Sequence, residues 1–157
     1  MLSLILAFAA QSAPNKLPPA QAVPPPTVGE EQAVLASVQS LLATFKAGDS
    51  AAMLRWVYAD GRVTATGTRA SGKGLRQQSW TEFSARVTPS STFEETITDP
   101  AIEIDGDAAM VWAPFVVRVG GKISNCGIDH FDLVRDNCSW KVMNLTFSSR
   151  TTGCPSQ

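Results

Sequence analysis

The residue best suited to carry out chemistry in this sequence is Asp129, which stands in the segment Asn125-Cys126-Gly127-Ile128-Asp129-His130-Phe131. A lone carboxylate among apolar groups loses solvation, which raises its pKa and suits it to transfer a proton or to bind a polar group of a ligand. The alternative is a structural role, in which Asp129 accepts a hydrogen bond from the backbone or from a tryptophan ring nitrogen. Both interpretations stay open at the level of sequence.

The neighbours of Asp129 depend on two hairpin loops that set the register of the last three strands. The first loop, Gly120-Gly121, reads as two residues long and the second, Asp136 to Cys138, as three. This register places Asp129 between Trp112 and Leu145 on the adjacent strands, so we expect a raised Asp129 pKa.

Side-chain alternation then divides the strands into two faces. The face of Asp129 also carries Met110, Trp112, Pro114, Asn125, Gly127, Phe131, Leu133, Met143, Leu145 and Phe147. The opposite face carries Val111, Ala113, Phe115, Val117, Cys126, Ile128, His130, Asp132, Val134, Trp140, Val142 and Asn144. Aromatic walls with a few polar groups are typical of small-ligand sites. The predicted ligand-binding residues are therefore Trp112, Asn125, Asp129, Tyr58, Phe131 and Leu145, with filling of the core as the alternative role for the aromatic ones.

Other reactive arrangements are disfavoured. His130 is the only histidine, and alternation sends it to the face opposite Asp129, which argues against an Asp-His dyad and a Ser-His-Asp triad. Glu94 and Glu95 are adjacent on a strand and point to opposite faces, so they cannot form a facing carboxylate pair of the glycosidase kind. Without Cys-x-x-Cys or His-Glu-x-x-His, no metal and no cofactor are predicted.

The segment Gly67 to Gly74 resembles part of a phosphate-binding loop. It reads Gly-x-x-x-x-Gly-Lys after a candidate strand, but Gly74 stands where a serine or threonine would bind magnesium. We interpret it as a loop at the mouth of the pocket.

The ends and the charge of the chain bound its location and partners. The 13 basic and 14 acidic residues form no dense positive stripe, so no nucleic-acid partner is expected. Residues 1–12 read as a signal peptide and 13–28 as a Pro/Ala-rich linker, which leaves 29–154 as the domain. The apolar run is far shorter than the roughly 20 residues that span a bilayer. We expect a periplasmic or secreted protein, with a cytoplasmic one as the alternative.

The domain itself reads as helices followed by strands. Helical periodicity covers Glu30 to Ala47 before Gly48, a second helix begins at Asp49 or Ser50, and Ser79 opens a capping box. A short strand is predicted over 62–66, and four antiparallel strands follow Phe93. This order is typical of an α+β fold in which N-terminal helices pack on a curved antiparallel sheet.

Four stretches carry a resemblance to a known superfamily. They are Val111 to Phe115, Asn125 to Phe131, Trp140-Lys141-Val142 and Arg150 to Cys154. Together they resemble bacterial nuclear-transport-factor-2-like (ketosteroid-isomerase-like) proteins, near the lumazine-binding-like branch. The resemblance implies a cystatin-like cone that holds a small molecule, acidic residues inside the cone and a tendency to form symmetric dimers. It implies no particular activity, because such proteins include isomerases, cyclases, dehydratases and plain binders.

Three functions follow as hypotheses. The first is an exported domain that binds a small apolar molecule without catalysis. The second is a cofactor-free isomerase or dehydratase in which Asp129 is the general acid or base, and the third is a dimerising scaffold without a ligand. A homodimer is expected through the face that carries Val111, Phe115, Val117, Ile128, Val134, Trp140 and Val142, which would otherwise be an exposed apolar patch.

The three cysteines complete the predictions. In the register above, Cys126 lies beside Ser148, so a tail that folds back after Arg150 brings Cys154 within bonding range. Cys138 lies in the distant hairpin loop, about 36 Å from Cys126 at about 3.3 Å per residue. We predict a Cys126–Cys154 disulfide, with Cys138 free or bridging two chains.

Overall fold

The fold is given by a computed structural model that describes residues 27–67 and 74–155. Helices and strands follow in the order α1 (Val28–Ala47), α2 (Ser50–Arg55), β1 (Arg62–Gly67), β2 (Arg76–Ser79), α3 (Trp80–Ser84), β3 (Glu94–Ile97), β4 (Ala101–Asp105), β5 (Ala108–Val119), β6 (Lys122–Asp136) and β7 (Ser139–Ser149). The predicted signal peptide, most of the linker and the interior of the Gly67 to Gly74 loop lie outside the described residues.

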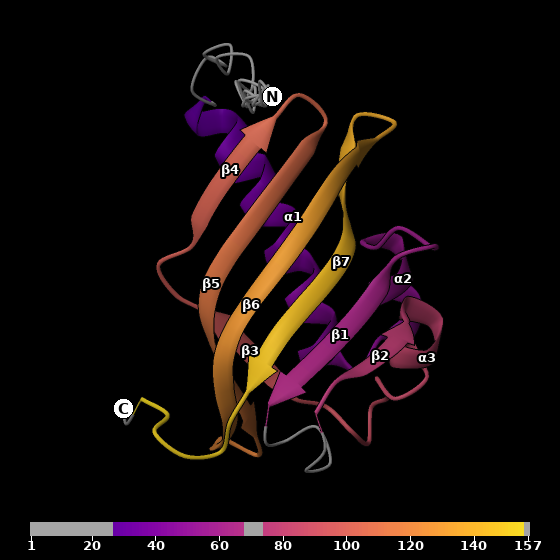
Figure 1. Ribbon diagram of the computed structural model, residues 1–157. Helices are drawn as coiled ribbons and strands as arrows, with labels where there is room; N and C mark the ends of the chain where they lie inside the picture. The colour runs from indigo at the N-terminus through magenta and orange to yellow at the C-terminus, as the bar shows by residue number, and fades with distance from the viewer. Residues whose placement is uncertain (1–26, 68–73, 156–157) are drawn as a thin grey trace, which may run out of the picture.

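The strands form one curved sheet in the order β2-β1-β7-β6-β5-β3, with β4 also paired to β5 (Figure 1). Helix α1 lies across one face of this sheet, and α2 and α3 lie at the side of β1 and β2. The predicted α+β fold is confirmed, but the sheet is mixed because β1 pairs with β7 in parallel. Five strands follow Phe93 instead of four, and β2 was not predicted.

Helix α1 begins and ends at local signals. The Thr27 hydroxyl and the Glu30 carboxylate form a capping box, and Gly48 ends the helix with a left-handed φ of 66°. Thr27 and Val28 therefore belong to the helix start and not to the predicted linker. The buried side of α1 includes Val34, Val38, Leu41 and Phe45. No helix in the described part of the chain is long and apolar enough to cross a membrane.

The predicted register of β5, β6 and β7 was wrong, because each hairpin contains a β-bulge. Val117 lies opposite Asn125 while Arg118 lies opposite Ile123, so residue 124 is extra in β6. Asp132 lies opposite Asn144 while Leu133 lies opposite Val142, so residue 143 is extra in β7. The loop between these strands has two residues, 137 and 138, both with positive φ. A two-residue loop with two positive φ values matches the twist of a hairpin, which explains why the three-residue reading failed.

Because of the bulge at residue 124, the β5 residues that share a face with Asp129 are the opposite set from the predicted one. Val111, Ala113, Phe115 and Val117 share the face of Asp129, and all four are buried beneath the helices or in the cavity wall. The residues named for the homodimer are therefore largely core residues, and that surface assignment is wrong. The homodimer itself stays a prediction; a monomer mass from light scattering at micromolar concentration would contradict it.

The bulge at residue 143 is held by Trp80 at the start of α3. The fully buried Trp80 donates its indole N–H to the Met143 carbonyl at 2.9 Å. Gly61 approaches the same carbonyl so closely that a Cβ there would lie 1.7 Å from the oxygen. Glycine at this position and the tryptophan donor together accommodate the extra residue.

We expect Trp80→Phe to lower the free energy of unfolding by about 1–3 kcal/mol, because the partly buried Met143 carbonyl loses its donor. Urea unfolding followed by circular dichroism measures this. Trp112→Phe is the matched control, since Trp112 is 49% exposed and should tolerate the change. Equal stability of both variants would contradict the anchoring role of the indole.

Candidate functional site

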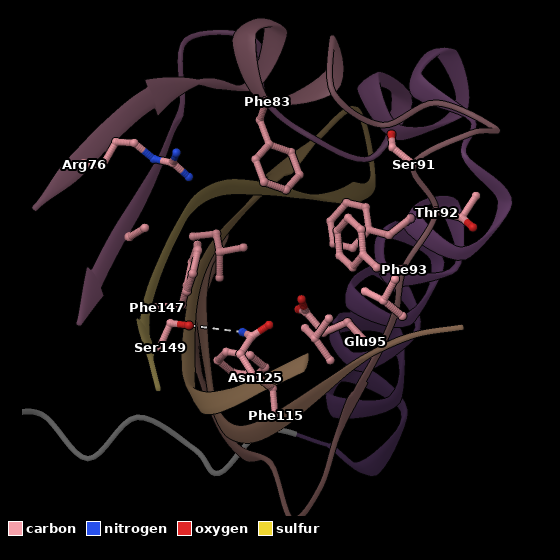
Figure 2. Close-up of a pocket in the computed structure, with 15 residues that line it drawn as sticks. Arg76, Phe83, Ser91, Thr92, Phe93, Glu95, Phe115, Asn125, Phe147 and Ser149 are labelled. Atoms are coloured by element: carbon pink, nitrogen blue, oxygen red, sulfur yellow. Dashed lines mark hydrogen bonds between the residues drawn. The ribbon is translucent and has the colours of Figure 1, made fainter. Parts of the chain in front are cut away.

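A cavity of about 390 Å³ opens on the helix-covered side of the sheet (Figure 2). Its wall is largely apolar, with phenylalanine rings on opposite sides. The lining residues are Phe45, Ala65, Arg76, Phe83, Ser91, Thr92, Phe93, Glu95, Phe115, Val117, Val119, Asn125, Leu145, Phe147 and Ser149. A volume of this size suits a small organic molecule.

The aromatic walls are held by contacts between the rings themselves. Phe93 stacks on Phe45 with ring centroids 4.9 Å apart, and Phe83 meets Phe45 edge to face at 5.5 Å. On the sheet side Phe115 and Phe147 meet edge to face at 6.1 Å. Such pairs restrict ring motion and so present a preformed apolar surface.

Glu95 is the acidic residue that lines the cavity. Strand β3 pairs antiparallel with β5, with Glu95 opposite Val117. Its neighbour Glu94 binds Lys46 of α1 at 2.8 Å on the protein surface, whereas the Glu95 carboxyl group points into the cavity (Figure 2). Alternation thus separates the two glutamates, as predicted, and leaves Glu95 inside.

Glu95 and Asp129 form a buried carboxyl pair. Asp129 is only 1% exposed, and its carboxyl group interacts directly with that of Glu95. Burial raises the pKa of Glu95 to about 7. Burial, followed by the adjacent charge of Glu95, raises the pKa of Asp129 well above its ordinary value. Both shifts favour the protonated form, and a hydrogen bond between the two carboxyl groups requires a shared proton.

Two oxygens of this pair receive no hydrogen bond from a donor elsewhere in the described chain. They are Glu95 Oε1 and Asp129 Oδ2, and both are buried. A buried polar atom without a partner costs free energy, and a ligand group can supply the missing bond. Among residues 27–67 and 74–155, no three His, Cys, Asp or Glu side chains gather where they could hold a metal ion.

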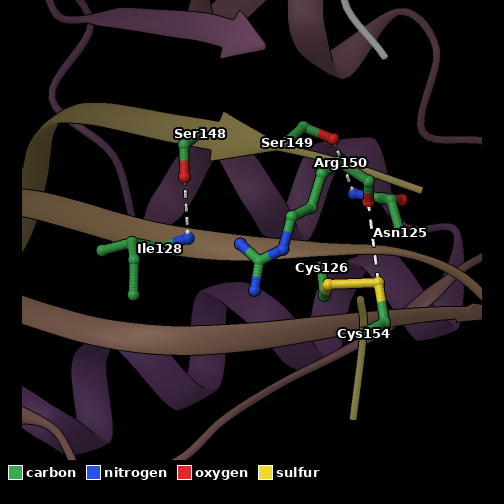
Figure 3. The surroundings of a disulfide bond; sticks show 7 residues. All are labelled: Asn125, Cys126, Ile128, Ser148, Ser149, Arg150 and Cys154. Carbon is green, nitrogen blue, oxygen red and sulfur yellow. Dashed lines mark hydrogen bonds between the residues drawn. A yellow bond between two sulfur atoms is a disulfide. The ribbon is translucent and has the colours of Figure 1, made fainter. Parts of the chain in front are cut away.

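Asn125 and Ser149 form the polar part of the wall beside the pair. Asn125 Nδ2 donates to Ser149 Oγ at 3.1 Å, which joins β6 to the end of β7. The Cys126–Cys154 disulfide lies directly behind this contact and ties the C-terminal tail to β6 (Figure 3). Cys126 faces Arg150 instead of Ser148, and the two backbones exchange hydrogen bonds. The predicted disulfide is confirmed, and the remaining cysteine, Cys138, is exposed and free.

The structure brings together only some of the predicted ligand-binding residues. Asn125 and Leu145 line the cavity, and Asp129 lies next to the lining residue Glu95. Trp112 is on the other face of the sheet, because the bulge in β6 places it opposite His130 and not opposite Asp129. Two further assignments are also wrong. Phe131 is fully buried in the core, and Tyr58, 36% exposed, is held by its backbone to Val142 outside the cavity wall.

His130 lies where alternation predicted, on the face opposite Asp129. Its Nε2 is 3.4 Å from Asp132 Oδ1, and its ring contacts that of Trp112 at 5.8 Å. An Asp129-His130 dyad is therefore absent from the site. The expected rise in the Asp129 pKa is confirmed, but its cause is burial together with Glu95, while its cross-strand neighbours are Ala113 and Phe147.

Glu95 is the functional residue that sequence reasoning missed. The sequence suggests for Glu95 only a facing pair with Glu94, which strand alternation excludes. The available signal was its spacing: Phe93, Glu95 and Ile97 alternate along one strand, and an acid between two inward-facing apolar residues shares their face. That spacing places a carboxyl group inside the core, where its partner Asp129 comes from a strand far away in sequence.

Comparisons with solved structures show which known fold this chain has. No family profile matches the chain, and a search of curated proteins finds no match. Solved structures match the chain at low sequence identity. One is a protein of unknown function with a cystatin-like fold from Nostoc punctiforme, which is 10% identical with a TM-score of 0.64. The match covers 80% of this chain and 95% of the other. A nuclear-transport-factor-2-like protein from Shewanella baltica is 19% identical with a TM-score of 0.59, and the match covers 82% of this chain and 97% of the other. Another from Novosphingobium aromaticivorans is 12% identical with a TM-score of 0.62, and the match covers 81% of this chain and 85% of the other. The chain thus has the cystatin-like fold of nuclear-transport-factor-2-like proteins.

Proposed function

We propose that this protein binds a small, largely apolar molecule in the cavity between α1, α3 and the sheet. The phenylalanine walls contact the apolar body of the ligand. The Glu95–Asp129 pair and the Asn125 amide hold one polar group of the ligand. The observation that carries this proposal is the Glu95 carboxyl group, which points into an aromatic cavity and has a buried oxygen that no described donor outside the carboxyl pair reaches.

Ligand binding explains why such a pair persists. Removing two carboxyl groups from water is unfavourable, so a chain that only needed to fold would be more stable with apolar residues at these positions. A ligand that donates to or accepts from the pair offsets part of this cost. The third hypothesis, a filled scaffold without a ligand, is disfavoured because about 390 Å³ of the interior is not filled by side chains.

We also propose that the protein is exported. The apolar run near the N-terminus supports this, and a disulfide between Cys126 and Cys154 is stable in an oxidising compartment. Three free thiols in protein taken from its native host would contradict export.

The binding proposal is tested with protein purified from its host. We expect native mass spectrometry to detect a retained small molecule in a ratio of one per chain. Ala65→Phe should remove it, because Ala65 lines the cavity and a phenyl ring there occupies the ligand's volume. Trp112→Ala is the matched control and should retain the molecule, since it changes an aromatic residue on the other face. Loss from both variants, or retention by both, would contradict binding in this cavity.

A second candidate function is proton transfer on the bound molecule, as in an isomerase or a dehydratase. The observation in its favour is the pKa of Glu95, which burial raises to about 7, a value that suits a general acid or base near neutral pH. Glu95 would exchange the proton with the ligand, and Asp129 would tune its pKa. Exchange of ligand hydrogens for deuterium in the presence of the wild type but not of Glu95→Gln would distinguish an enzyme from a plain binder.

A further inference from the structure

The rim of the cavity carries positive charge. Arg76 extends from the edge strand β2, lines the cavity and directs its guanidinium group toward the other lining residues (Figure 2). It is exposed, and within residues 27–67 and 74–155 no carboxylate forms an ion pair with it. An arginine fork without a protein partner at the mouth of a pocket is suited to bind an oxyanion.

Arg86 adds to this charge. Its guanidinium group lies over the ring of Phe83, 5.7 Å from the centroid, and donates a hydrogen bond to Gln78. Burial and then the positive charge of Arg76 lower the pKa of Arg86, so the two arginines are close enough to repel each other. The Glu82 carboxylate, which accepts hydrogen bonds from Ser79 at the start of α3, opposes this effect but does not reverse it.

The inner end of the cavity has a different character. The raised pKa values of Glu95 and Asp129 favour a pair that shares a proton, and such a pair presents a hydrogen-bond donor as well as an acceptor. A second anionic group of a ligand would be repelled there, whereas a carbonyl or hydroxyl group would find a partner. The cavity is therefore cationic at its rim, apolar along its walls and acidic beside Glu95.

We propose, on the basis of the binding function above, that the ligand is a small amphipathic anion with a flat apolar body. Its carboxylate or sulfonate binds Arg76 at the rim, its body lies between the phenylalanine walls, and an uncharged polar group reaches Glu95. This arrangement fixes the direction in which the molecule enters.

Two fluorescent dyes with the same aromatic skeleton test this inference. Anilinonaphthalene sulfonate carries an anionic group that N-phenylnaphthylamine lacks. We expect Arg76→Gln to weaken binding of the sulfonate by about fivefold or more and to change binding of the neutral dye by less than about twofold. Arg76→Lys should retain part of the preference for the sulfonate. Arg55→Gln, on the exposed side of α2, is the matched control and should leave both dyes unaffected.

The outcomes separate this inference from the binding proposal. If both dyes bind and Arg76→Gln changes neither, the anionic ligand is ruled out while the cavity remains a binding site. If neither dye binds to the folded wild type, the proposed binding function is overturned as well. If Arg55→Gln weakens the sulfonate as much as Arg76→Gln does, the effect reflects overall charge, and the role of Arg76 is overturned. Circular dichroism of each variant establishes that it is folded.

Discussion

Asp129→Asn is expected to raise the free energy of unfolding at pH 8 and to change it little near pH 4, because burial and the charge of Glu95 raise the pKa of Asp129 in the folded protein. In the wild type, the pKa of Glu95 rises from its ordinary value of 4.5 to about 7 on folding, through burial. The pKa of Asp129 rises as well, through burial and the charge of Glu95. Asparagine removes one of the two charges and can donate a hydrogen bond to the Glu95 carboxylate.

The direction of the pH dependence follows from these raised values. Below pH 4.5 Glu95 is protonated in both states, so it does not oppose folding. Between pH 4.5 and about 7 the unfolded chain loses this proton while the folded protein keeps it, and the wild type loses about 1.4 kcal/mol of stability per pH unit for such a group. Stability should therefore fall as the pH rises across this window.

Urea unfolding between pH 4 and pH 8.5 measures both curves. Asp132→Asn is the matched control, because Asp132 lies on the same strand but faces away from the cavity. It should reproduce the slope of the wild type. A wild type whose stability is flat or rises between pH 5 and 7 would contradict a buried pair that shares a proton.

Cys154→Ser should lower the free energy of unfolding by about 3–4 kcal/mol. The disulfide joins residues 28 positions apart and closes a loop that contains most of the β6–β7 hairpin, so its loss enlarges the conformational freedom of the unfolded chain. The half-buried Cys154 is the better position to change, since serine at the buried Cys126 would also place a hydroxyl group in the sheet.

Urea unfolding of oxidised protein, with and without a reductant, measures this effect. The reductant should destabilise the wild type to the level of Cys154→Ser and leave that variant unchanged. Cys138→Ser is the control, because Cys138 is exposed in a hairpin loop and forms no disulfide within the chain. A wild type whose stability does not respond to reduction would show that the bond contributes little to the fold.

The parts of the fold that were predictable from the sequence are those with local signals. Helix α1 was recognised from its periodicity and from Gly48, and α3 from the capping box at Ser79. The disulfide was predictable because both plausible registers bring Cys154 near Cys126. The residues that determine the two helices lie close together in sequence. The disulfide remains possible even when the strand register is wrong by two positions.

The candidate site was predictable only in part, because it depends on contacts between distant segments. The bulge at Met143 is stabilised by the Trp80 indole and the missing side chain of Gly61, both more than 60 positions away. The sequence of β7 alone does not indicate this bulge. Likewise Glu95 becomes a functional residue only when β3 brings it to Asp129. Asn125 and Leu145 were found because they happen to face inward in both registers.

The two bulges have a consequence for comparing this chain with its structural relatives. Along β6 and β7, side chains alternate between the inner and the outer face of the sheet only up to the extra residue. Beyond it, even-numbered and odd-numbered positions exchange faces. Moving a bulge by insertion and deletion would exchange the residues that contact a ligand for those that contact water, with no change in composition. Related chains can therefore diverge in specificity through the position of one backbone irregularity, and an alignment that ignores it would equate a ligand-binding residue with a surface one.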